Sequence, residues 1–115
     1  MKYMLLIHSN HDAWAGLSDD EGKAIMDEYY AFTQRLADSG ELVSGDPLQG
    51  PETATTVRVR DGKRSTTDGP FVETKEHLAG YYVVDCADLD RALELAEQIP
   101  DARFSGVEVR PVGEM

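Results

Sequence analysis

Apolar residues recur along the chain with two different periods, and each period predicts a different kind of element. Residues 3–7 and 80–84 are apolar at successive positions, which is typical of strands with both faces buried. Between them, apolar side chains recur every three or four residues, at positions 25, 29, 32 and 36, and predict an amphipathic helix. Ser18 and Glu21 have the spacing of a capping box at its start, and Gly40 follows its end.

The rest of the pattern completes an α+β fold. Further strands are predicted at residues 42–43, 55–60, 63–67 and 106–112, with Asp61-Gly62 as a hairpin turn. Asp88 caps a second helix, whose apolar stripe comprises positions 89, 92, 93, 96 and 99 and which stops at Pro100. The order β-α-β, hairpin, β-α-β predicts one domain over residues 1–115: a ferredoxin-like antiparallel sheet with two helices on one face and an inserted β-hairpin.

Two helices on one side leave apolar residues of the other sheet face uncovered. Large uncovered apolar surfaces are rare in monomers. The pattern therefore predicts a homodimer, in which a second copy covers this face and a ligand pocket lies between the sheet and the partner.

Composition narrows the partners and the compartment. The net charge is −11, from 22 acidic and 11 basic residues, so we expect neither nucleic acid nor an anionic membrane surface as a partner. The single cysteine, Cys86, excludes an intrachain disulfide and fits a reducing compartment. The apolar run at residues 3–7 is too short for a signal-peptide core or a membrane helix. A cytoplasmic protein is expected.

Ionisable residues gather just before the strand at residues 80–84. Asp68 begins an Asp-Gly-Pro turn, where its side chain is expected to bond the local backbone, and Glu73, Lys75 and His77 follow closely. A carboxylate beside a lysine or histidine at a pocket rim can act as an acid or a base. We predict His77 as the base, because histidine titrates near neutral pH, with Asp68 or Glu73 orienting it. The alternative interpretation is a solvated, charged turn.

Aromatic and polar side chains near these groups are the predicted ligand-binding residues: Trp14, His8, Phe71, Lys75, Tyr81 and Tyr82. Tyr81 and Tyr82 point to opposite sheet faces, so one is expected in the core and the other in the pocket. His8, His11 and Asp12 have metal-ligand chemistry but lie in a predicted loop that fixes no geometry, and we expect no metal. The chain has no phosphate loop, dinucleotide fingerprint or nucleophile elbow, so no cofactor is expected.

Three blocks, Asp68-Gly69-Pro70-Phe71, Glu73-Thr74-Lys75-Glu76 and Gly80-Tyr81-Tyr82, resemble the signature of the DGPF-domain proteins, a branch of the YCII-related superfamily. The resemblance implies a dimeric α+β barrel without a metal. In shorter YCII relatives a His–Asp pair uses a histidine of the first helix. This chain has no histidine between residues 18 and 39, so the pair is not carried over, although Asp46 lies near the position of its aspartate.

Two functions fit these features. The first is a cofactor-free enzyme that uses acid–base chemistry on a small organic molecule, of the lyase, isomerase or dehydrohalogenase type; related α+β barrels suggest it by analogy of fold. The alternative is a non-catalytic module for small-ligand binding or regulation. The resemblance makes a link to a sigma factor part of that alternative, because DGPF genes often lie beside genes for alternative sigma factors.

Overall fold

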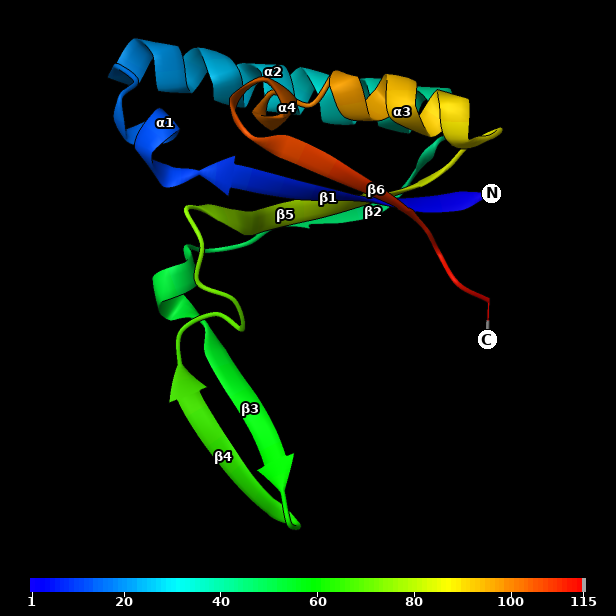
Figure 1. The fold of residues 1–115 in the computed structure, drawn as a ribbon. Helices are drawn as coiled ribbons and strands as arrows, with labels where there is room; N and C mark the ends of the chain where they lie inside the picture. Colours follow the sequence, from blue (N-terminus) through cyan, green and yellow to red (C-terminus); the bar gives the residue numbers. More distant parts are fainter. Residues whose placement is uncertain (115) are drawn as a thin grey trace.

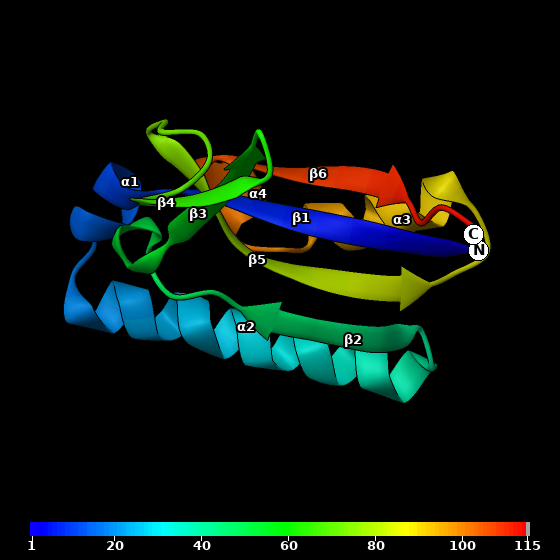
Figure 2. The same cartoon turned by 90° about the horizontal axis from the view of Figure 1, so that it is seen from below.

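The computed structural model describes residues 1–114 as a four-stranded sheet with helices on one face and a separate two-stranded arm (Figures 1 and 2). The elements are β1 (Lys2–Asn10), α1 (His11–Ala15), α2 (Asp19–Ser39), β2 (Leu42–Pro47), a 3₁₀ turn (Pro51–Thr53), β3 (Thr55–Arg60), β4 (Lys63–Asp68), β5 (Glu76–Asp85), α3 (Leu89–Glu97), α4 (Asp101–Phe104) and β6 (Gly106–Pro111). The strand order is β2-β5-β1-β6, and every pair is antiparallel. The predicted α+β fold with a ferredoxin-like sheet is confirmed.

Helix α2 begins and ends where its sequence predicts. The Ser18 side chain accepts a hydrogen bond from the Glu21 amide, and the Glu21 carboxylate accepts one from the Ser18 amide. Gly40 ends the helix with φ of 78°, a left-handed conformation that costs glycine little. Phe32 and Leu36 are buried against the sheet.

The core lies between the helices and one face of the sheet. Alternate residues of the two central strands point into it, namely Tyr3, Leu5 and Ile7 of β1 and Tyr82 and Val84 of β5. Helix α3 adds Ala92, Leu95 and Ala96. The stripe predicted for this helix was partly wrong, because Leu89 and Leu93 are each 48% exposed. The sheet instead buries the neighbouring stripe that contains Leu95.

Both central strands are longer than their apolar runs. Strand β1 continues through His8 to Asn10, where a loop was predicted, and pairs with the start of β5 at residues 76–78. The register shifts after Ile7, which leaves Ala79 as an extra residue and brings Ser9 opposite His77. Pairing between two polar segments cannot be read from hydrophobic alternation. It places His77 on a strand rather than in a loop.

The predicted hairpin forms an arm, β3 with β4, that is a sheet of its own. Its turn residues Asp61 and Gly62 have φ of 53° and 72°, as a tight hairpin turn requires. Figure 1 shows the arm projecting from the side of the sheet opposite the helices. Within residues 1–114 the Asp68 carboxylate at the arm's base makes no hydrogen bond or ion pair, so its predicted bond to the turn backbone is absent. The turn is held instead by the Gly69 amide, which donates to the Ala54 carbonyl at 2.7 Å.

None of the helices in the described part of the chain is both long and apolar enough to cross a membrane.

Candidate functional site

A cavity of about 450 Å³ opens between α2 and the sheet, at the end where α1 and α4 lie. Its lining comes from β1, α1, α2, β2, β5 and α4 of a single chain. The pocket predicted from the sequence was on the opposite side of the sheet, between the chain and a partner. Here the helices leave space because the sheet presents the small residues Gly45, Ala79 and Gly80 toward them.

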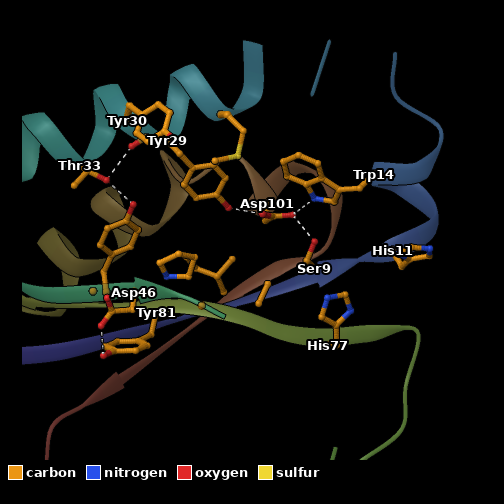
Figure 3. Close-up of a pocket in the computed structure, with 17 residues that line it drawn as sticks. Ser9, His11, Trp14, Tyr29, Tyr30, Thr33, Asp46, His77, Tyr81 and Asp101 are labelled. Carbon is orange, nitrogen blue, oxygen red and sulfur yellow. Dashed lines mark hydrogen bonds between the residues drawn. The ribbon is translucent and has the colours of Figure 1, made fainter. Parts of the chain in front are cut away.

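Asp101, the first residue of α4, forms the polar centre of the cavity wall (Figure 3). Its side chain accepts three hydrogen bonds, and the residue is only 3% exposed. Ser9 Oγ donates to Oδ1 at 3.0 Å, Trp14 Nε1 donates to the same oxygen at 2.8 Å, and the Tyr29 hydroxyl donates to Oδ2. Three elements, β1, α1 and α2, therefore meet at one carboxylate.

The Tyr29 hydroxyl is held in its neutral form. Burial and, next, the hydrogen bond to Asp101 raise the pKa of Tyr29 far above the usual tyrosine value. A phenol that keeps its proton remains a donor, so the carboxylate is the acceptor of this pair. Ser9, Trp14 and Tyr29 together satisfy Asp101 with neutral donors.

Two further tyrosine hydroxyls, each bonded to a polar side chain, line the part of the cavity near β2. The Tyr82 hydroxyl lies 2.6 Å from Thr33 Oγ1, and the Tyr81 hydroxyl donates to Asp46 Oδ2 at 3.0 Å. Burial raises the pKa of Tyr82, whose ring belongs to the core and contacts Phe32 edge-on. The hydrogen bond to Asp46 raises the pKa of Tyr81. Both tyrosines line the cavity, although only one of them was predicted to do so from the alternation of side chains along the strand.

Two histidines complete the polar lining. His77 comes from β5 and His11 from the start of α1. Figure 3 shows His77 rising from its strand on the side where Ser9 and Asp101 lie, which is the consequence of the register shift in β5. An imidazole and a buried carboxylate thus face the same space. This pair can move a proton and hold a polar group of a ligand.

Of the predicted site residues, the structure brings His77, Trp14, Tyr81 and Tyr82 to the cavity and leaves the others outside its lining. Four of the residues outside the lining, Asp68, Phe71, Glu73 and Lys75, lie at the base of the arm before β5 begins. Phe71 is 76% exposed, with the Arg58 guanidinium 5.3 Å from its ring centre. His8 points to the opposite face of the sheet, where Nε2 lies 3.5 Å from Glu108 Oε1.

No local sequence pattern points to Asp101 as a site residue. It follows Ile99-Pro100, where the pattern indicated only the end of a helix, and its three donors lie 72 to 92 positions away in the chain. Within residues 1–114 no three histidine, cysteine, aspartate or glutamate side chains are placed to hold a metal ion. Besides aliphatic and small residues, the cavity lining contains aromatic rings, hydroxyls, two histidines and two carboxylates.

Comparison with known proteins identifies the family. A sequence profile of the YCII-related domain matches residues 1–115. The chain belongs to the YCII-related family. This family is the one that the Asp-Gly-Pro-Phe block resembled.

One curated relative of this YCII-related chain is the uncharacterized protein R00369 of Rhizobium meliloti (strain 1021), which is 34% identical over 114 residues, 97% of this chain and 92% of that protein. Among solved structures, a similar fold occurs in the 5-chloro-2-hydroxyhydroquinone dehydrochlorinase TftG of Burkholderia phenoliruptrix AC1100, in complex with 2,5-dihydroxybenzoquinone. The TM-score is 0.55 and the sequence identity 12%, over all of this chain and 96% of the other. At this identity the likeness is one of fold.

Proposed function

We propose that this chain is a cofactor-free enzyme that moves a proton on a small, largely apolar organic molecule bound in the cavity. One observation carries the proposal: the buried Asp101 carboxylate, fixed by three neutral donors, faces the same cavity as His77. An imidazole and a carboxylate that converge in one cavity are candidates for an acid and a base.

The size and lining of the cavity favour a small organic ligand. A volume of about 450 Å³ lies within the range of small-molecule sites. Five aromatic residues line it, and they offer flat, apolar surface with a few hydroxyls for orientation. The fold neighbour is a dehydrochlorinase whose structure holds a quinone, which supports this fold as a framework for a ring-sized ligand.

The proposed roles follow from the geometry. His77, in its neutral form, takes a proton from an activated carbon of the ligand. The same proton returns at another atom in an isomerase, or a leaving group departs with its electron pair in a lyase or dehydrohalogenase. Asp101 accepts a hydrogen bond from the ligand and so holds it in place. Tyr29 keeps Asp101 oriented.

Hydrogen–deuterium exchange tests this proposal without knowledge of the full reaction. Small ketones, phenols and amines with acidic C–H bonds are incubated with the protein in deuterated water, and exchange at carbon is followed by NMR. His77→Gln should slow the catalysed exchange by on the order of a hundredfold or more. The matched control is His8→Gln, the same change on the other sheet face, and it should leave the rate unchanged.

Exchange that is equally fast in the wild type and in His77→Gln would contradict the catalytic role. Ligand binding in the cavity without any exchange would favour the binding module instead.

We also propose that a second copy covers the open face, the sheet side that carries Met4, Leu6 and Val83. These side chains are only partly buried in the single chain. The arm projects on this side (Figure 1), and its Val57 and Val59 are 57% and 59% exposed. An isolated two-stranded hairpin is marginally stable in water, so a partner surface is needed to cover it.

Charge supports the same partner for the arm. Residues 55–68 hold four basic and two acidic side chains, whereas the rest of the chain holds seven basic and twenty acidic ones. A basic arm therefore complements the acidic body of a second copy. Sedimentation should show a dimer at micromolar concentration that Leu6→Lys converts to a monomer. A wild-type monomer at that concentration would contradict the proposal.

A further inference from the structure

Apart from the histidines His11 and His77, the charged side chains around the cavity are of one sign. Its lining includes the carboxylates of Asp46 and Asp101 and, among the described residues, no lysine or arginine. The basic residue nearest to Asp101 in sequence, Arg103, has its guanidinium 2.8 Å from the Glu28 carboxylate. Asp46 is bonded by a phenol, the hydroxyl of Tyr81.

The charge of Asp101 is satisfied in hydrogen bonding but is not neutralised. Its donors are a hydroxyl, an indole N–H and a phenol that keeps its proton. These neutral donors occupy three of the roughly four acceptor sites of the carboxylate and leave its unit charge in place. Within residues 1–114 no ion pair includes Asp101. A buried charge without a counter-ion is unfavourable, and a ligand of opposite charge relieves that cost.

Aromatic rings surround these carboxylates. Trp14 comes from α1, Tyr29 and Tyr30 come from α2, and Tyr81 and Tyr82 come from β5. The faces of such rings attract cations, and tryptophan does so most strongly. Carboxylates among aromatic rings disfavour an anion, because both groups present negative charge to it.

We infer that the ligand of this cavity is an organic cation, a protonated amine or quaternary ammonium on an apolar or aromatic body. The ammonium group lies toward Asp101, and the body of the ligand lies among the tyrosines. This inference rests on the proposed function only for the location of the site, and it does not depend on the proton-transfer chemistry. A metal cation does not fit, since no three ligating side chains within residues 1–114 are placed to hold one.

Three probes of similar size and different charge test the inference: benzylammonium, benzyl alcohol and benzoate. Binding is measured by calorimetry at pH 8 and at low salt, where charge interactions are screened least. Benzylammonium should bind on the order of tenfold more tightly than benzyl alcohol, and benzoate most weakly. The inference is overturned if benzoate or benzyl alcohol binds as tightly as benzylammonium. It is also overturned if benzylammonium shows no binding at concentrations up to about 10 mM, which corresponds to very weak affinity.

Asp101→Asn supplies the residue-level test, with Asp68→Asn as the matched control outside the cavity. Asp101→Asn should lower the preference for benzylammonium over benzyl alcohol to about twofold, whereas Asp68→Asn should leave it unchanged. Retained binding of benzyl alcohol shows that the cavity of the variant is intact. An unchanged preference in Asp101→Asn would refute the inference. If this variant does not fold, the ranking of the three probes on the unmodified protein decides the question.

Failure of this inference and failure of the proposed function give different results. Selective binding of benzylammonium that depends on Asp101, without hydrogen exchange in deuterated water, would support the cation site and contradict the proposed enzymatic function. Hydrogen exchange that depends on His77, with benzoate as the most tightly bound probe, would support the proposed enzymatic function and contradict the cation site.

Discussion

Replacing Asp101 with alanine would leave three hydrogen-bond donors facing a space without an acceptor. The donors are Ser9 Oγ, Trp14 Nε1 and the Tyr29 hydroxyl. A buried donor left without a partner costs about 1–3 kcal/mol. Water can enter the cavity and satisfy part of this loss, so the lower end applies to each donor. The free energy of unfolding should therefore fall by about 3 kcal/mol in Asp101→Ala.

Asparagine at the same position should cost much less. Its side-chain oxygen can accept from Ser9 and Trp14, and its amide group can donate to the Tyr29 hydroxyl, which turns to accept. Three charge-assisted bonds become neutral ones, but the cost of burying an uncompensated charge disappears. These changes oppose each other, so we expect Asp101→Asn to lie within about 1 kcal/mol of the wild type.

Urea denaturation followed by circular dichroism gives both values by linear extrapolation, at one fixed protein concentration. Asp68→Ala is the control, because its carboxylate makes no hydrogen bond or ion pair within residues 1–114, and it should change stability by no more than about 0.5 kcal/mol. If Asp101→Ala and Asp101→Asn cost the same, the three hydrogen bonds do not support the fold as described, and the reasoning fails.

Three further predictions concern other parts of the chain. Folding raises the pKa of Tyr29, so the stability that this shift contributes is full below the unfolded value near 10 and is lost as the pH rises above it. In urea denaturation at a series of pH values, Tyr29→Phe should therefore reduce the fall in the free energy of unfolding between about pH 9.5 and 11. An unchanged slope would count against this prediction. The hydrogen bonds from Arg91 lower the pKa of Glu41, so their contribution to stability is present above the unfolded pKa of 4.5 and is lost as the pH falls through the lower folded value. Glu41→Gln should therefore reduce the loss of stability in acid below pH 4.5. A plot of stability against pH that runs parallel to that of the wild type would disprove this. Gly45→Ala would place a Cβ 2.8 Å from the Tyr81 carbonyl oxygen, so it should lower stability by about 1–3 kcal/mol, and a melting temperature equal to that of the wild type would rule out this crowding.

Elements whose residues carry their own local signal were predictable from the sequence. The capping box at Ser18, the left-handed Gly40 and the Asp61-Gly62 turn each follow from chemistry within a few residues. Helix α1 carried such a signal as well. The Asn10 side chain accepts from the amides of residues 12 and 13, which is the usual chemistry of an N-cap, although the segment was predicted as a loop.

The site depends on contacts that no local pattern records. His77 reaches the cavity because β1 and β5 pair beyond their apolar runs and the register shifts at Ile7. Asp101 is the polar centre of the cavity wall only because α4 brings it beside β1, α1 and α2, which supply its three donors. Asp68 and Glu73 looked like members of the same site because they precede β5 closely in sequence. The bend at the base of the arm separates them from the cavity instead.

The claim that the cavity around Asp101 is the functional site can be tested on a single NMR resonance. Trp14 is the only tryptophan of the chain, so its indole Nε1–H, which donates to Asp101, gives one unambiguous signal. In a titration of the ¹⁵N-labelled protein with benzylammonium, this signal and the amide of His77 should shift together and saturate with one dissociation constant. Shifts confined to the open face or to the segment from Asp68 to Lys75, with the indole signal unmoved, would contradict the assignment of the site.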